Sequence, residues 1–362
     1  MRIAFIGLPG SGKSTVFQAL HGSHSQPSAA PHGGGRVQLA SVKALDANVE
    51  HLAAIFKPKK TTHASIEFAD VEGSVLGGEQ KGRGDQVLAT YQNMEALAHV
   101  VHAFESEVVP HPDGSVDPGR DLADLNTELV LTDLQVVERR LERIETRSSK
   151  GDKTVEREEL DLLRRCRQAL EEGTPLRQLA LTEHEQRRQR GFGFLTSKPQ
   201  VVVLNIDEEQ QQENRAAAGA NLEPLLTSRD ALCVLCAKLE MELSQLEPED
   251  AAVFMAELGI AQAATATLLR ASIEALGLLS FYTVGDDEVK AWLLAQGSTA
   301  PRAGGAIHSD LERGFIRAEV VSCQDLLDVG SLAAARKQGL LRVEGKDYIV
   351  ANGDVITIRF NV

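Results

Sequence analysis

Residues 7–15 read G-L-P-G-S-G-K-S-T, which fits the phosphate-loop pattern of Gly, four residues and then Gly-Lys-Ser. The apolar run 3–6 before the loop is typical of a buried parallel strand, and residues 16–20 continue as a helix. A strand that turns through glycines into a helix directs backbone N–H groups and the positive end of the helix dipole into one cup. The sequence therefore predicts an α/β P-loop NTPase with a doubly wound, mostly parallel sheet.

The residues of this loop have expected roles in binding a nucleoside triphosphate. Lys13 is placed to contact the β- and γ-phosphates and to stabilise charge on the transferring phosphoryl group. The Ser14 hydroxyl is placed to hold Mg²⁺. The loop residues expected to contact the nucleotide are Pro9, Gly10, Ser11, Gly12, Lys13, Ser14 and Thr15. Small-molecule kinases share this loop pattern, so a kinase is an alternative at this point.

A second motif, D-x-x-G, ends the apolar stretch 65–69. We expect Asp70 to hold Mg²⁺ through a water molecule, and the Gly73 N–H to sense the γ-phosphate as part of the catalytic site. After a phosphate loop, this spacing favours a GTPase-type switch over a kinase. Ser74 stands where a typical GTPase has a water-orienting Gln, and its side chain is too short for that role.

The segment expected to bind the base departs from the guanine-binding pattern N-K-x-D. The apolar run 200–204 predicts a buried strand, which is followed by Asn205, Ile206 and, two residues on, Glu208. Ile206 replaces the Lys, and Glu208 replaces the Asp that accepts two hydrogen bonds from guanine. Because Glu is one methylene longer, we expect weakened guanine selectivity, with Asn205 and Glu208 reading the base.

A further apolar strand, 231–235, leads into a short loop that is expected to flank the base. The residues of this loop are Cys236, Ala237 and Lys238. Cys233 and Cys236 have the spacing of a redox or metal pair, but the strand is apolar and has no second ligand pair nearby. We therefore interpret both cysteines as buried packing residues.

These motifs together resemble the family of YchF-type Obg-like ATPases. The resemblance covers nearly the whole chain. It is carried by the N-x-x-E segment 205–208, by K-P-K-K at 57–60, by I-E-F at 66–68, and by E-V-K-A-W at 288–292 and E-R-G-F-I at 312–316. It implies a G domain with a helical insertion and a C-terminal TGS domain of ubiquitin-like β-grasp type. It also implies an ATP-preferring hydrolase that associates with ribosomes.

We expect three domains. The G domain comprises residues 1–119 and 199–280, an inserted α-helical coiled-coil hairpin comprises 120–198, and the TGS domain comprises 281–362. The hairpin is predicted because apolar residues recur at three- and four-residue steps, which is the pattern of a coiled-coil seam. The seam residues are Val130, Leu134, Val137, Leu141 and Ile144 in the first helix, and Leu160, Leu163 and Leu170 in the returning helix.

The switch regions leave two functions open. One is Mg²⁺-dependent hydrolysis of ATP, with GTP as an equal or second substrate, by a translation-associated regulatory NTPase. The alternative is a nucleotide-binding switch with little or no hydrolysis that acts as an interaction protein through its TGS domain. The alternative is favoured by the first-switch segment 28–35, which contains no Thr for Mg²⁺, and by Ser74.

His111 is the candidate for activating the attacking water. It lies in the Pro- and Gly-containing loop 109–114 after the apolar strand 97–101, and loops at such strand ends line the site in doubly wound folds. Imidazole can orient or deprotonate a water near neutral pH. Its position also resembles that of a loop histidine in the family. The alternative is a solvent-exposed loop histidine.

Composition restricts the partners. The net charge of −14 over 362 residues argues against nucleic-acid binding by the whole surface. We therefore expect any contact with the ribosome or with structured RNA on the helical arm and the TGS domain. Arg187, Arg188 and Arg190 are the most concentrated basic cluster. Because no apolar run approaches membrane-spanning length, we expect no membrane partner and a cytoplasmic protein.

Overall fold

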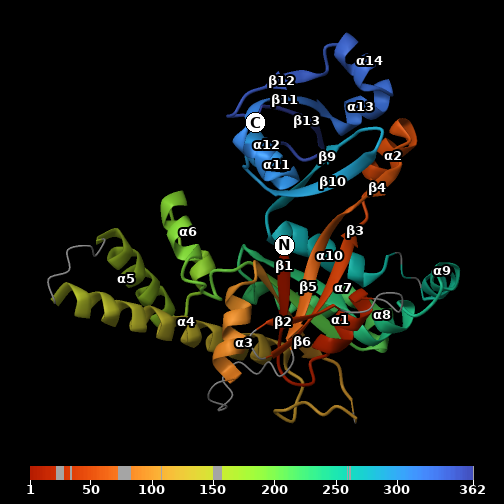
Figure 1. The fold of residues 1–362 in the computed structure, drawn as a ribbon. Coiled ribbons are helices and arrows are strands. Elements are labelled where there is room, and N and C mark those ends of the chain that lie inside the picture. The colour runs from red at the N-terminus through yellow and green to blue at the C-terminus, as the bar shows by residue number, and fades with distance from the viewer. Residues whose placement is uncertain are drawn as a thin grey trace. The chain divides into compact units, whose positions relative to one another are not determined.

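The computed structural model describes residues 1–21, 28–32, 35–71, 83–106, 108–149, 157–258, 260 and 262–361. The chain divides into two compact units. One consists of Met1–Ser41 and Glu67–Ala275, and the other of Val42–Ile66 and Leu276–Val362. The described strands form two sheets, and Figure 1 shows the helices and strands of both units.

The sheet of the first unit confirms the predicted doubly wound, mostly parallel arrangement. Its described strands have the order β2-β3-β5-β1-β6-β7-β8. β1 pairs in parallel with β5 and β6, β6 with β7, and β7 with β8, whereas β2 and β3 are antiparallel. The strand bounds are β1 Arg2–Ile6, β2 Ser28–His32, β3 Gly35–Ala44, β5 Ala64–Val71, β6 Ala96–Ala103, β7 Gln200–Ile206 and β8 Asp230–Leu235.

The central strands are apolar because both of their faces are covered. Every residue of β6 and of β7 is buried, which is typical of parallel strands that have helices on both sides. The helices of this unit are α1 Lys13–His21, α3 Arg83–Gln92, α4 Pro118–Ser149, α5 Arg157–Glu171, α6 Glu183–Arg190, α7 Glu208–Ala220, α8 Ala237–Leu243, α9 Pro248–Glu257 and α10 Ala264–Ala275, with 3₁₀ turns η1 Leu176–Gln178 and η2 Glu223–Leu225. Among the described residues, no helix is both long and apolar enough to cross a membrane.

The helical hairpin packs as its apolar pattern predicts. α4 has 32 residues and so is about 48 Å long, and α5 returns against it (Figure 1). All eight predicted seam residues lie in the apolar cluster between the two helices, with Val137 and Leu163 fully buried. The coiled-coil seam is therefore confirmed. Residues 150–156, which separate α4 from α5, lie outside the described residues.

A buried carboxylate ties α4 to the segment that leads into β7. Asp133 Oδ1 accepts a hydrogen bond from the Leu195 N–H at 2.9 Å, and Oδ2 accepts from the Thr196 N–H at 2.7 Å and from the Thr196 hydroxyl at 2.6 Å. Burial raises the pKa of Asp133 to about 6 in spite of these bonds, which favour the ionised form. The base of the arm is thus held by hydrogen bonds as well as by apolar packing.

The second unit contains a segment that the predicted boundaries assign to the G domain. Its described strands have the order β12-β11-β13-β9-β10-β4. The strand bounds are β4 Lys60–Thr62, β9 Leu278–Thr283, β10 Glu288–Ala295, β11 Phe315–Ser322, β12 Arg342–Glu344 and β13 Asp354–Phe360, and the helices are α2 Ala47–Phe56, α11 Ala300–Ile307, α12 Ser309–Arg313, α13 Cys323–Val329 and α14 Leu332–Lys337. β4 pairs in parallel with β10, and Val49 and Leu52 of α2 are fully buried in the same apolar cluster as Tyr282.

This packing explains why Val42–Ile66 belongs with the C-terminal residues. A short strand and an amphipathic helix gain their burial from the sheet that they cover, and not from their neighbours in the sequence. The unit also begins earlier than the predicted residue 281, because β9 starts at Leu278. The division into three domains, with the hairpin as a separate one, stays a prediction.

Candidate functional site

The candidate nucleotide site is a cavity of about 1020 Å³ where β1, β6, β7 and β8 end. Because these strands run in parallel, their carboxyl ends meet at one edge of the sheet, where ligands bind in doubly wound folds. The predicted residues that line this cavity are Gly10, Gly12, Lys13, Ser14, Thr15, Asn205, Ile206, Glu208, Cys236, Ala237 and Lys238. The structure therefore brings the predicted phosphate and base segments together.

The glycines of the phosphate loop allow a backbone path that other residues would obstruct. Gly12 has a φ of +93°, and a Cβ atom there would lie 2.3 Å from Asn205 Nδ2. Gly7 has a φ of +149°, and a Cβ atom there would lie 2.4 Å from the Val100 carbonyl oxygen. The loop can thus approach Val100 of β6 and Asn205 of β7 this closely only because both glycines lack a side chain.

Lys13 is the first residue of α1, and its ammonium folds back over the loop. Nζ donates to the carbonyl oxygens of Gly7 at 2.8 Å and Leu8 at 3.0 Å. Burial lowers the pKa of the Lys13 ammonium, and the nearby Asp70 carboxylate acts in the opposite direction. The Lys13 ammonium is therefore held against the phosphate loop, and Lys13 lines the cavity.

Ser14 and Asp70, which were predicted as metal ligands from two distant segments, are in direct contact. The Ser14 hydroxyl donates to Asp70 Oδ2 at 2.9 Å. A hydroxyl and a carboxylate are oxygen donors of the kind that Mg²⁺ prefers, and they lie beside the phosphate cup. The donor set therefore fits Mg²⁺.

Asn205 joins the phosphate loop to the base loop. Its Nδ2 donates to the Ser11 carbonyl oxygen at 3.0 Å, and its Oδ1 accepts from the Ala237 N–H at 2.9 Å. The side chain is buried, with 4% of the residue exposed. Two hydrogen bonds therefore join its amide to the two loops, and direct reading of the base by Asn205 stays a prediction.

The base segment keeps one charged pair at the cavity. Glu208 Oε1 lies 2.7 Å from Lys238 Nζ, and this hydrogen bond raises the pKa of Lys238. Ile206 is buried in the apolar core, and so is Cys236, whose thiol pKa is raised by burial. Glu208 and Lys238 thus pair with each other at the cavity wall, and they are the charged residues among those predicted to bind the base.

His111 is buried beside Asp121 and is not among the residues that line the candidate nucleotide cavity. Its Nδ1 accepts from the Asp113 N–H at 3.1 Å, so the ring proton is on Nε2, which donates to Asp121 Oδ2 at 2.6 Å. Both side chains are 2% exposed, and Arg120 contacts the other oxygen of Asp121 at 2.8 Å. The alternative of a solvent-exposed histidine is wrong, because burial and two hydrogen bonds hold the ring.

Some lining residues were missed and some predicted residues are placed elsewhere. The missed residues are Phe104, Glu105, Ser106, Val109, Asp207, Glu209 and Met241. Phe104 to Ser106 follow the carboxyl end of β6 directly, and that position was a usable signal. Pro9 is exposed and Ser11 is buried, and neither lines the cavity. Gly73 and Ser74 lie outside the described residues.

Comparisons with known proteins identify the family of this chain. Residues 2–137 match the family described as 50S ribosome-binding GTPase, and residues 278–361 match a YchF GTPase C-terminal family described as protein of unknown function (DUF933). The "Ribosome-binding ATPase YchF" of Bacillus subtilis is 38% identical and aligns over 99% of this chain and 98% of its own. The protein of the same name from Escherichia coli O157:H7 is 36% identical and aligns over 100% of this chain and 99% of its own. The structure titled "Structure of the Schizosaccharomyces pombe YchF GTPase" matches with a TM-score of 0.84 at 27% identity, covering 99% of this chain and 97% of the other.

Replacing Lys13 tests the phosphate cup. Lys13→Ala should weaken ATP binding by roughly 30- to 160-fold, because hydrogen bonds to a charged group contribute about 2–3 kcal/mol. Isothermal titration calorimetry measures this, and the thermal unfolding midpoint checks that the variant is folded. Lys43→Ala, which removes an exposed lysine from β3, is the control and should bind as the wild type does. An affinity of Lys13→Ala within twofold of the wild type would contradict the assigned site.

Proposed function

Because the chain belongs to the YchF family, whose fold and P-loop NTPase site it carries, we propose that it binds and hydrolyses ATP in a Mg²⁺-dependent reaction, with GTP as an equal or second substrate. We further propose that it acts as a regulatory NTPase on ribosomes. The observation that most supports nucleotide binding is that Asn205 forms hydrogen bonds to both Ser11 and Ala237. These bonds join the loop expected to bind phosphates to the loop expected to flank the base.

The residues present account for binding of the triphosphate. Lys13 and the N–H groups at the start of α1 would hold the β- and γ-phosphates and stabilise negative charge on them during transfer. Ser14 and Asp70 would hold Mg²⁺, which when bound neutralises charge on the same phosphates. The Gly73 N–H would sense the γ-phosphate, as the motif predicts.

The base preference should follow from the Glu208–Lys238 pair. Accepting hydrogen bonds from the N1–H and N2–H₂ groups of guanine uses both oxygens of the Glu208 carboxylate, and guanine would compete there with Lys238, whose Nζ lies 2.7 Å from Oε1. Adenine makes no such demand, since its amino group needs one acceptor and its ring nitrogens need donors. We therefore propose that ATP binds at least as well as GTP.

Shortening Glu208 should move the preference towards GTP. In Glu208→Asp the carboxylate regains the length used by guanine-selective sites, and we expect the GTP-to-ATP affinity ratio to rise severalfold. Glu209→Asp is the matched control, because Glu209 lines the same cavity and should leave the ratio unchanged. Titration of both nucleotides gives the ratios. A wild-type preference for GTP of tenfold or more, about 1.4 kcal/mol, would overturn the proposed base reading.

We propose that His111 activates the attacking water after it leaves Asp121. The two hydrogen bonds at its ring and its absence from the lining of the cavity mean that the described arrangement cannot perform this step. This observation also favours the alternative function, a switch that binds nucleotide and hydrolyses it little. Turnover measurements distinguish the two.

Removal of the His111 ring should lower turnover without lowering affinity. We expect His111→Ala to reduce kcat for ATP by about 100-fold or more, in line with the usual contribution of general acid–base catalysis, and to leave ATP affinity unchanged. His184→Ala, which removes an exposed histidine of α6, is the control and should keep wild-type turnover. Wild-type turnover in His111→Ala would exclude the histidine from catalysis, and a wild type without turnover would support the switch.

Ribosome association is proposed from the names of the relatives and from the arm. Arg187, Arg188 and Arg190 lie in the last turn of α6. Arg187 pairs with Glu183 at 3.3 Å and Arg188 with Glu158 at 3.2 Å, and all these carboxylates are largely exposed. Exposed ion pairs are weak, so these arginines could exchange a carboxylate for a phosphate. A cytoplasmic location would follow from ribosome binding.

Neutralising this cluster should weaken binding to ribosomal particles. We expect the triple variant Arg187→Gln, Arg188→Gln, Arg190→Gln to co-sediment less with ribosomes than the wild type, and the wild-type binding to fall as salt rises. The control carries the same charge change on exposed positions elsewhere on the arm, at Arg139, Arg164 and Arg167. If the cluster variant binds as the control does at every salt concentration, the contact belongs to the second unit or does not involve the arm.

A further inference from the structure

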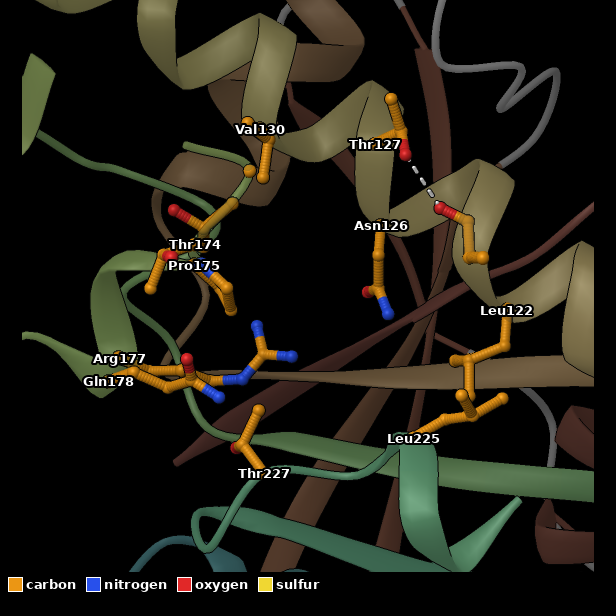
Figure 2. A pocket seen from close by; sticks show the side chains of 13 residues that line it. Leu122, Asn126, Thr127, Val130, Thr174, Pro175, Arg177, Gln178, Leu225 and Thr227 are labelled. Atoms are coloured by element: carbon orange, nitrogen blue, oxygen red, sulfur yellow. Dashed lines mark hydrogen bonds between the residues drawn. The ribbon is translucent and has the colours of Figure 1, made fainter. Parts of the chain in front are cut away.

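A second cavity lies at the base of the helical arm and shares no lining residue with the nucleotide site. Its volume is about 410 Å³, within the range of small-molecule sites. Leu122 and Asn126 of α4 line one wall, Pro175 and Arg177 line another, and Leu225 and Thr227 close the third (Figure 2). Three segments that are distant in the sequence thus form one site inside the first unit.

The floor of this cavity is a buried ion pair. Arg177 Nε lies 2.7 Å from Asp230 Oδ1, and Nη2 donates to Oδ2 at 3.3 Å, with both side chains 3% exposed. Asp230 Oδ2 also accepts from the Thr227 N–H at 2.8 Å. The guanidinium is therefore fixed in place, and among the described residues its Nη1 donates to no partner and remains for a ligand.

Opposite the guanidinium is an acceptor that no protein group satisfies. Asn126 Oδ1 is buried and has no hydrogen-bond partner among the described residues. Figure 2 shows the Asn126 amide and the Arg177 guanidinium pointing into the same space. A buried acceptor without a partner is unfavourable, so a donor from a bound molecule would stabilise it.

The remaining lining residues restrict the ligand to a neutral one. Arg177 is the one charged residue among those that line the cavity in the described chain, and Asp230 balances it. A phosphate or carboxylate would therefore lack a second cation. The apolar side chains of Leu122, Val130 and Leu225, the last of which is 51% exposed, suit the faces of a flat ring.

We propose that this cavity is a second binding site, for a neutral lactam or cyclic amide about the size of a nucleobase. The carbonyl oxygen of the ligand accepts from Arg177 Nη1, and the adjacent ring N–H donates to Asn126 Oδ1. The ring itself packs between α4 and the turns η1 and η2. Both unsatisfied groups are thereby paired by a single amide edge, in which a donor and an acceptor stand side by side.

Uracil and 1,3-dimethyluracil are the matched probes. They share the same ring and carbonyl groups, but methyl groups replace both ring N–H hydrogens in the second compound, which removes the donors and adds bulk at that edge. Each is titrated into the full-length protein with excess ADP present to occupy the nucleotide site, and binding is followed by NMR. We expect saturable binding of uracil, and binding of 1,3-dimethyluracil that is weaker by at least fivefold to tenfold, the usual effect of one lost buried hydrogen bond.

A variant places the binding in this cavity. Asn126→Leu keeps the size of the side chain and removes the acceptor, and it should weaken uracil binding by roughly fivefold to tenfold. Thr127→Val is the control, because the Thr127 hydroxyl already donates to the Ala123 carbonyl oxygen at 2.9 Å, and it should bind uracil as the wild type does. Thermal unfolding and ADP affinity confirm that both variants are folded.

Three results would overturn the proposal. They are an absence of saturable uracil binding to the wild type, equal affinity for the two compounds, and unchanged uracil affinity in folded Asn126→Leu. The comparison of the two compounds uses only the wild type, so equal affinity would overturn the proposal even if Asn126→Leu does not fold.

Discussion

The nucleotide site depends on a single buried amide. Asn205, at the end of β7, donates to Ser11 in the phosphate loop and accepts from Ala237 at the start of α8. Gly12 has no side chain to obstruct this contact, since a Cβ atom there would lie 2.3 Å from Asn205 Nδ2. Because a buried amide that loses a partner is costly, this arrangement keeps the loops that hold phosphates and base at a fixed separation.

Helix α4 connects features that are far apart in the unit. In its first turn Asp121 holds His111, in the next turns Leu122 and Asn126 line the second cavity, and further along Asp133 anchors the base of the arm. A helix is stiff over this length, so a displacement at one of these points changes the position of the others. The candidate water-activating group and the arm are therefore joined by one rigid element.

The second unit illustrates why folding units differ from sequence segments. α2 and β4 come early in the chain, but they bury their apolar residues and make their strand pairing with the C-terminal sheet. Sequence motifs implied a C-terminal β-grasp domain through the family resemblance, and the described strands form a sheet there. They contained no information on which sheet an isolated helix and a three-residue strand would cover, since that is decided by contacts between distant residues.

The sequence by itself determined the P-loop fold, the parallel sheet, the hairpin seam and the proximity of Ser14 to Asp70, because each depends on a local motif or on the order of strands and loops. It also predicted Glu208 and Lys238 as base-binding residues, and both line the candidate nucleotide cavity. Only the tertiary structure decided that Asn205 bonds to Ser11 and Ala237 and that His111 bonds to Asp121. Spacing along a chain specifies which edge of a sheet a residue reaches, whereas its hydrogen-bond partners depend on the packing of residues distant in sequence.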